Sequence, residues 1–341
     1  MRSLPWVVAA VLLLLVPACG DPEADVAGEG ARRTGALTPS PDQEELVHVD
    51  IARLHDGAAG QAPDAEAARP VRGRGPRGGN KKKDVYEVDA SVLENAGRIE
   101  GLIRLESKPE LRHVVVDKDV EACGHTSHPS ERCVFDAETL GLASCVVTLE
   151  GIARGKDWPE AMKPKDRRGA LVTRQCKYVP HVQVLRERTL VIVDNKDNAL
   201  HNLHGYYESM LNTRSSFSGW PARSGFGVGS GVKGHVVPEA FLDKAGKYLL
   251  RCDIHPWMNG YFHAVTNPYF AVTDTSGTFA LEGVPPGSYT LKIWHEGMQE
   301  IPTIKDNQIT GYDYGEDWVE EVPVTVEAGQ TVRIERSVPP R

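Results

Sequence analysis

The chain has 341 residues, of which 40% are hydrophobic and 25% are charged, a composition typical of globular proteins that excludes a fibrous or polytopic membrane protein. Its 39 basic and 47 acidic residues give a net charge of -8, which argues against general nucleic-acid binding because that function requires a basic surface. At about 150 residues per domain, the length predicts roughly two domains.

Residues 1–18 are predicted to form a signal peptide. Arg2 supplies a short positive region, residues 4–16 are almost entirely apolar, and this apolar run is shorter than the roughly 20 residues that cross a bilayer. The run Leu15-Val16-Pro17-Ala18-Cys19 resembles a bacterial lipoprotein signal. The resemblance implies lipidation of Cys19 and anchoring to the membrane, and plain secretion after cleavage at Ala18 is the alternative. Either route leads to the cell envelope, periplasm or outer surface, where disulfides are permitted.

Residues 19–95 are predicted to form a disordered tether. The stretch 21–68 is rich in Ala, Gly, Pro, Asp and Glu and shows no sustained periodicity. A basic run interleaved with glycine follows it, consisting of Arg72, Arg74, Arg77, Lys81, Lys82 and Lys83. Such a segment buries too little apolar surface to offset the entropy that is lost on ordering it.

From residue 96 onward the sequence predicts strands. Short runs of β-branched and aromatic residues are bounded by Gly, Pro, Asn and Asp, and only 238–247 suggests a short helix. Strands are expected over 97–105, 114–116, 146–149, 181–185, 189–193, 247–252, 261–265, 279–281, 289–294, 322–326 and 331–337. The sequence therefore predicts an all-β fold made of β-sandwiches.

Two turns near the C-terminus carry a family pattern. The chain reads Asp-Thr-Ser-Gly at 274–277, continues as a strand, and then reads Pro-Pro-Gly-Ser-Tyr at 285–289. This pattern resembles the carboxypeptidase regulatory-like domains, small prealbumin-like sandwiches whose first strand resembles Gly97–Leu105. The resemblance implies one sandwich that an inserted domain interrupts, and no catalytic chemistry. We expect its first part at 96–170, the inserted domain at 171–267 and its second part at 268–341.

The inserted segment contains residue types that bind copper. Cys252, His255 and Met258 follow a predicted strand with the spacing C-x2-H-x2-M, and His201 follows an earlier strand. Two imidazoles, one thiolate and one thioether form the ligand set of a blue-copper site, because sulfur ligands suit Cu(I) and imidazoles suit both oxidation states. The sequence predicts one copper site built from these four residues.

The spacing also resembles that of a known family. Cys-x-x-His-Pro-aromatic-Met with an upstream His-Asn-hydrophobic-His resembles the cupredoxins, and most closely the amicyanin and plastocyanin group. The resemblance implies a Greek-key sandwich in which Asn202 bonds the ligand loop and His255 lies at the solvent edge where electrons pass. It also implies that Pro256 and Trp257 contribute to an apolar rim around that edge. The glycine-rich loop at 206–237 departs from the family.

These residues favour a lipid-anchored copper protein that exchanges single electrons with a redox partner protein, for which a cytochrome is one candidate. The repeated H-x-H pairs of a multicopper oxidase are missing from the sequence, and it offers no nucleophile–base pair, so an enzyme is disfavoured. A copper carrier or sensor is one alternative. A cell-envelope module that binds carbohydrate or protein is the other.

Four cysteines remain once Cys19 and Cys252 are assigned. They form an even set that two disulfides would absorb, although the sequence does not separate the three pairings of Cys123, Cys133, Cys145 and Cys176. His125 and His128 lie between the first two of these cysteines, so a second metal site is the alternative to disulfides there.

Overall fold

The structure is a computed structural model that describes residues 86–110, 112–163, 168–208, 226–228, 235–242 and 244–340. The predicted signal peptide, Cys19, the tether before residue 86 and most of the glycine-rich loop lie outside these residues. The described chain is all-β, as predicted, with two short 3-10 helices and one α-helical turn. None of its helices has the length and hydrophobicity that a membrane span requires.

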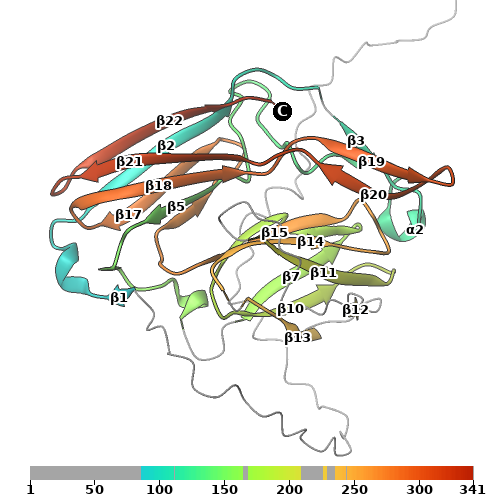
Figure 1. The fold of residues 1–341 in the computed structure, drawn as a ribbon, viewed down its shortest axis with the longest axis horizontal. Helices are drawn as coiled ribbons and strands as arrows, with labels where there is room; N and C mark the ends of the chain where they lie inside the picture. Colours follow the sequence, from blue (N-terminus) through green and yellow to red (C-terminus); the bar gives the residue numbers. More distant parts are fainter. Residues whose placement is uncertain are drawn as a thin grey trace, which may run out of the picture. The chain divides into compact units, whose positions relative to one another are not determined.

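One sandwich combines strands from both ends of the described chain (Figure 1), and we call it the split sandwich. Its three-stranded sheet has the order β17-β2-β22, and its four-stranded sheet has the order β16-β5-β18-β21. β2 pairs antiparallel with β17 and parallel with β22. The strands are β2 (Gly97–Leu105), β5 (Val146–Glu150), β16 (Phe270–Val272), β17 (Thr278–Val284), β18 (Gly287–His295), β21 (Trp318–Val326) and β22 (Thr331–Val338).

The core of the split sandwich is apolar. Ile99 and Ile103 of β2 face Leu149, Leu291 and Ile293, and all five are fully buried. Burying each such side chain stabilises the fold by about 1.5–3 kcal/mol. This favours strands in which buried apolar residues alternate with less buried ones.

A glycine allows β2 and its neighbours to approach closely. A Cβ atom at Gly101 would lie 2.2 Å from the carbonyl oxygen of Ile334 and 2.5 Å from the ring of Phe279. Any larger residue would therefore separate β2 from β22 or displace the ring.

The second sandwich, which we call the inserted sandwich, lies between β5 and β16 in the sequence. Its two sheets have the orders β12-β11-β14-β15-β9 and β13-β10-β7-β8, and Leu171, Val191, Tyr248 and Phe262 are buried in its core. The strands are β7 (Arg168–Arg174), β8 (Lys177–Val179), β9 (Val182–Arg186), β10 (Leu190–Asn195), β11 (His201–Glu208), β12 (Phe226–Val228), β13 (His235–Phe241), β14 (Gly246–Arg251) and β15 (Asn259–Val265).

Two local expectations were wrong. No helix forms in the described part of 238–247, because β13, which ends at Phe241, pairs antiparallel with β10, and β14, which begins at Gly246, pairs with β11 and β15. Residues 86–95, expected to belong to a disordered tether, are structured: they contain β1 (Glu87–Val88) and η2 (Ala90–Leu93), and β1 pairs with β6 (Arg154–Gly155). Tyr86 stacks edge-on against Trp158 and Tyr269, which supplies the apolar contact that orders this segment.

Two short antiparallel pairs extend from the sandwiches. β3 (His113–Val115) and β4 (Ser127–Pro129) flank α2 (Val120–Cys123), whereas β19 (Glu300–Lys305) and β20 (Gln308–Tyr314) form a hairpin after β18. Tyr312 of this hairpin and Val114 of β3 belong to the core cluster of the inserted sandwich. Both pairs therefore pack against the domain that contains the predicted copper ligands.

A buried ion pair at the split sandwich is hydrogen-bonded to the inserted sandwich. Arg132, which precedes β5, lies 2.7 Å from the carboxylate of Glu296, which follows β18, and both side chains are fully buried. The Arg132 guanidinium also donates to Asn259 and Tyr261 on β15, in each case over 3.0 Å. His181 bonds the second carboxylate oxygen of Glu296. Removal of one charge from such a group destabilises the fold strongly, because it leaves the opposite charge buried without compensation.

Candidate metal centre

Strand pairing brings two distant segments to one end of the inserted sandwich. β11 pairs antiparallel with β14, with His204 opposite Arg251, so the start of β11 lies beside the residues that follow β14. His201 is the first residue of β11, and Cys252 comes directly after β14. The ligands that lie far apart in the sequence are therefore neighbours in the fold.

The loop between β14 and β15 is closed by its own backbone. The Cys252 amide donates to the Met258 carbonyl over 3.2 Å, and the Met258 amide donates to the His255 carbonyl over 2.9 Å. The amide of Asp253 donates to the side-chain oxygen of Asn202 over 2.7 Å. Asn202 thus bonds the ligand loop to β11, which is the contact that the resemblance implied.

Three of the four predicted ligands converge. The Nδ1 atoms of His201 and His255 are 2.9 Å apart, and the Cys252 Sγ lies 3.9 Å from the His255 Nδ1. The ligand atoms of all three residues lie within 4.8 Å of one another, and the residues are at most 3% exposed. Met258 is buried in the apolar core of the inserted sandwich, which also contains Cys252.

The site is built to hold a thiolate. Burial alone would raise the pKa of Cys252, but hydrogen bonds from His201, His255 and the backbone amides of Asn202 and His255 outweigh it and lower the pKa to about 6. Burial likewise opposes the charge on His201, but bonds to Asp197 and Cys252 raise its pKa to about 9. Because thiolate is the form that ligates metals, Cys252 is prepared for a metal at neutral pH.

Two carboxylates that the sequence analysis missed complete the site. Asp197 Oδ2 accepts a hydrogen bond from His201 Nε2 over 2.8 Å, and Asp119 Oδ2 accepts one from His255 Nε2 over 2.9 Å. Asp197 could have been suspected from its place four residues before His201. Asp119 gives no such signal, because it is 136 residues from His255.

His255 does not lie at the solvent edge, where the resemblance had placed it. The residue is fully buried, because Asp119 and the segment around α2 cover the ring edge that carries Nε2. Trp257, expected on an exposed rim, is 2% exposed and donates its indole N–H to the Cys176 carbonyl over 3.2 Å. Pro256 is half-buried.

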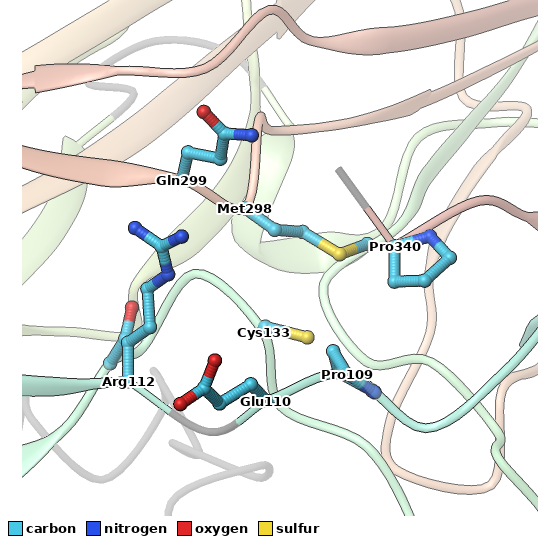
Figure 2. Close-up of a pocket in the computed structure, with 8 residues that line it drawn as sticks. Pro109, Glu110, Arg112, Cys133, Met298, Gln299 and Pro340 are labelled. Atoms are coloured by element: carbon cyan, nitrogen blue, oxygen red, sulfur yellow. The ribbon is translucent and has the colours of Figure 1, made fainter.

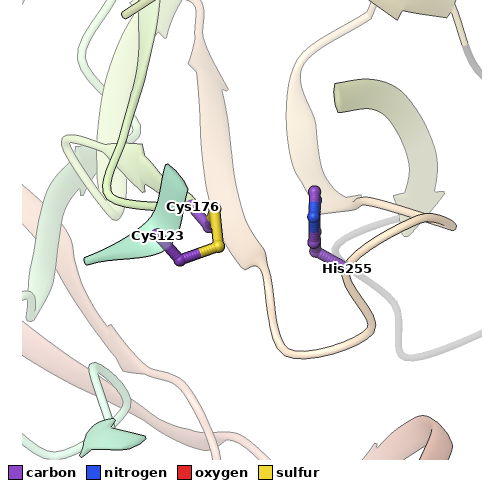
Figure 3. Close-up of side chains that lie close together, drawn as sticks. All are labelled: Cys123, Cys176 and His255. Carbon is purple, nitrogen blue, oxygen red and sulfur yellow. A yellow bond between two sulfur atoms is a disulfide. The ribbon is translucent and has the colours of Figure 1, made fainter. Parts of the chain in front are cut away.

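Only one of the two expected disulfides is present. Cys123 of α2 is bonded to Cys176, in the turn between β7 and β8, and Figure 3 shows this bond with His255 on a neighbouring loop. Cys133 and Cys145 are free thiols. Their surroundings differ, because Cys145 is enclosed in the core of the split sandwich and Cys133 lines a surface pocket.

The pocket at Cys133 does not resemble a metal site. It has a volume of about 310 Å³, and Figure 2 shows the Cys133 thiol and the Met298 side chain at its wall. Burial, with a smaller contribution from Glu296, raises the pKa of Cys133 to about 11, so the thiol stays protonated at neutral pH. A protonated thiol is a poor metal ligand.

The second metal site considered between Cys123 and Cys133 does not form. Cys123 is consumed by its disulfide, and His125 and His128 contact each other edge to face with ring centroids 5.2 Å apart. Among the described residues, every group of three His, Cys, Asp or Glu ligand atoms close enough for a metal includes His201 or His255.

The donor set at the centre fits copper. Two imidazole nitrogens and a thiolate face one another in a water-excluding cluster, with a buried thioether on the same loop. These are the ligand types of a trigonal copper site with a weak axial sulfur. His204, in contrast, lies on β11 with its ring stacked on Tyr206 and its Nδ1 3.2 Å from Asp253, outside this group.

No protein-family model matches the chain, and no curated protein matches its sequence. Among solved structures, a reduced mutant amicyanin aligns at 15% identity over 35% of this chain and 98% of its own, with a TM-score of 0.22. Amicyanin from Paracoccus versutus aligns at 17% identity over 35% and 97%, with a TM-score of 0.21. A Cu-containing nitrite reductase from Thermus scotoductus aligns at 19% identity over 28% of this chain and 22% of its own, with a TM-score of 0.21.

Proposed function

We propose that this protein binds one copper ion through His201, Cys252, His255 and Met258 and transfers single electrons. The observation that supports the proposal is the convergence of two imidazoles, whose Nδ1 atoms are 2.9 Å apart, with a buried thiol whose pKa is lowered to about 6. The TM-scores near 0.2 mark a weak overall similarity, so the proposal depends on this local geometry.

The chain's own residues supply a rigid and dry binding site. Cys252 offers a thiolate, which the amides of Asn202 and His255 stabilise by hydrogen bonds. Asp197 and Asp119 fix the two imidazole rings. Copper held by these groups would supply a one-electron couple between Cu(I) and Cu(II). Little movement of the ligands would accompany the transfer, because the loop is closed by its own backbone and bonded to β11.

The absorption spectrum tests the proposal directly. Addition of Cu(II) to the purified protein should give an intense blue colour from thiolate-to-copper charge transfer, with one copper per chain. Cys252→Ser should abolish the colour, whereas Cys145→Ser, which alters an equally buried thiol in the split sandwich, should leave it unchanged. A colourless protein with one bound copper would favour a carrier or sensor, and a protein that binds no copper would contradict the proposal.

We also propose that the protein is exported and lipid-anchored at Cys19, where it exchanges electrons with a redox partner protein such as a cytochrome. The lipoprotein-like run before Cys19 supports the anchoring. The full chain, expressed in a bacterial host, should fractionate with membranes, and Cys19→Ala should release it. Recovery of the unaltered chain away from membranes would contradict the anchor and leave the copper proposal intact.

A further inference from the structure

A segment from outside the inserted sandwich lies against the metal centre. We call residues 113–129 the strap, which contains β3, α2 and β4. Its Asp119 accepts the Nε2–H of His255 over 2.9 Å. Four residues later, Cys123 fastens the strap to Cys176, and both sulfur atoms lie within 4.8 Å of a His255 ring nitrogen (Figure 3).

The turn that holds the disulfide also holds the second carboxylate. The amides of Gln175 and Cys176 donate to Asp197 over 2.6 and 3.0 Å. Asp197 in turn accepts the Nε2–H of His201 over 2.8 Å. One disulfide-bonded turn is therefore linked to both imidazoles, to His201 through Asp197 and to His255 through the strap.

The two carboxylates define which nitrogen of each ring faces the thiol. An ionised carboxylate can only accept a hydrogen bond, so Nε2 of each ring carries the proton that it donates. The opposite nitrogen, Nδ1, then faces the centre in both rings, as the 2.9 Å separation of the two Nδ1 atoms shows. A carboxylate in this position holds the ring orientation and the tautomer of a metal-binding histidine.

Asp119 is well placed to act on His255 without supporting the fold. Its side chain is 52% exposed, so its removal opens no cavity in the core. Its backbone has a left-handed conformation with a φ of 47°, which glycine and asparagine adopt readily. Its carbonyl accepts from the amides of Ala122 and Cys123, and these bonds survive any change of the side chain.

We propose that Asp119 is a positioning residue for copper binding: carried by the disulfide-fastened strap, it orients His255 with Nδ1 toward Cys252 and closes the Nε2 edge of the ring to solvent. This inference rests on the proposed copper function and adds a residue that the ligand spacing does not contain. It also assigns the Cys123–Cys176 disulfide a role at the site, because the disulfide fastens the strap that carries Asp119.

Three variants test the role of the carboxylate. Asp119→Gly removes the acceptor, and Asp119→Asn keeps a neutral acceptor. Glu121→Gln, the matched control, removes an exposed charge from α2, the helix that follows Asp119. Loss of such a carboxylate partner costs about 10- to 100-fold in metal affinity. We expect Asp119→Gly to weaken Cu(I) binding by this factor in competition with a chromophoric chelator and to release Cu(II) to EDTA faster. Asp119→Asn should show a smaller change, and Glu121→Gln none.

Two further measurements separate positioning from a general loss of structure. The reduction potential and the charge-transfer band should shift in Asp119→Gly but not in Glu121→Gln. Before copper is added, ¹⁵N NMR of the His255 ring should show a protonated, hydrogen-bonded Nε2 in the unaltered protein, and the signal of this hydrogen bond should be lost in Asp119→Gly. The double variant Cys123→Ser/Cys176→Ser should change affinity and spectrum in the same direction as Asp119→Gly.

The outcomes distinguish this inference from the proposed function. An unaltered protein that never binds copper would overturn both. A blue unaltered protein whose Asp119→Gly variant matches it in affinity, potential and the Nε2 signal of the His255 ring would overturn the positioning role alone. An effect of Asp119→Gly with none in the double cysteine variant would overturn the contribution of the disulfide.

Discussion

The two sandwiches each bury a cysteine thiol, and the two thiols have opposite chemistry. Cys145 in the split sandwich is fully buried, and this burial raises its pKa to about 12. Cys252 at the end of the inserted sandwich is 3% exposed, yet hydrogen bonds outweigh its burial and lower its pKa to about 6. At neutral pH one thiol therefore remains protonated while the other is largely a thiolate.

The difference lies in the hydrogen-bond donors around each sulfur. Cys145 belongs to a mainly aliphatic cluster, where a hydrogen bond with the Thr273 side chain lowers its pKa by less than burial raises it. Cys252 is surrounded by two imidazoles and two backbone amides. Depth of burial alone therefore does not define a metal ligand, because the donors that stabilise the thiolate decide whether a buried cysteine can act as one.

The largest loss of stability is expected when the buried ion pair of Arg132 and Glu296 is broken. Arg132→Met should destabilise the protein by about 3–5 kcal/mol, because it removes the guanidinium partner of the fully buried Glu296 carboxylate and leaves only His181 beside it. Urea denaturation, followed by tryptophan fluorescence, measures this loss. If the two sandwiches unfold as one body, the transition should remain single and move to lower urea.

The matched control for this test is Arg333→Met. Arg333 pairs with Glu100, but its side chain is 79% exposed, so we expect a loss of at most about 1 kcal/mol. Equal losses in the two variants would contradict the larger contribution of the buried pair to stability.

Arg132 and His181 outweigh the burial of Glu296 and lower its pKa. The stability from this pair is therefore present above the pKa that Glu296 has in the unfolded chain, and it is lost as the pH falls through the pKa of Glu296 in the folded protein. The difference in free energy of unfolding between the unaltered protein and Arg132→Met should therefore shrink in acid.

The next largest effect is expected from the disulfide. Cys123→Ser/Cys176→Ser should lower the free energy of unfolding by about 2–4 kcal/mol, because the bond closes a loop with a sequence separation of 53 residues. Thermal denaturation of the copper-free protein measures this loss apart from any change at the metal centre. A double variant as stable as the unaltered protein would show that the strap is held by packing alone.

Elements whose patterns are local could be predicted from the sequence. β2 was predicted with its observed bounds, because Ile99 and Ile103 alternate with less buried residues and glycine marks its start. The His201, Cys252 and His255 cluster was also predictable, since two ligands share one short loop and the third opens a strand. Strand β19 was missed, since its apolar residues Ile301 and Ile304 are three positions apart and do not alternate as in a strand with one buried face, and five of its six residues are exposed.

The remainder of the site depends on contacts between distant parts of the chain. Asp119 reaches His255 only because the strap packs on the inserted sandwich, and neither residue type nor spacing indicates that contact. The burial of His255 could not be predicted for the same reason: the family pattern describes one sandwich, whereas the covering segment comes from outside it. The choice of Cys123–Cys176 among the possible disulfides likewise follows from the packing of α2 on the turn after β7.

The smallest effects on stability are expected when either of the two buried cysteines is replaced by serine in the copper-free protein. Cys145→Ser places a hydroxyl in an apolar core and should cost about 1–3 kcal/mol. Cys252→Ser should cost less than about 1 kcal/mol, because the hydroxyl can use the same imidazole and amide partners. With copper present the order reverses: the Cys145 variant should still gain about 2.7 kcal/mol when free copper is 100 times the dissociation constant, whereas the Cys252 variant should gain far less. Thermal denaturation of both variants, with and without copper, would reveal this reversal, and equal responses to copper would contradict the division of the two thiols into a packing residue and a ligand.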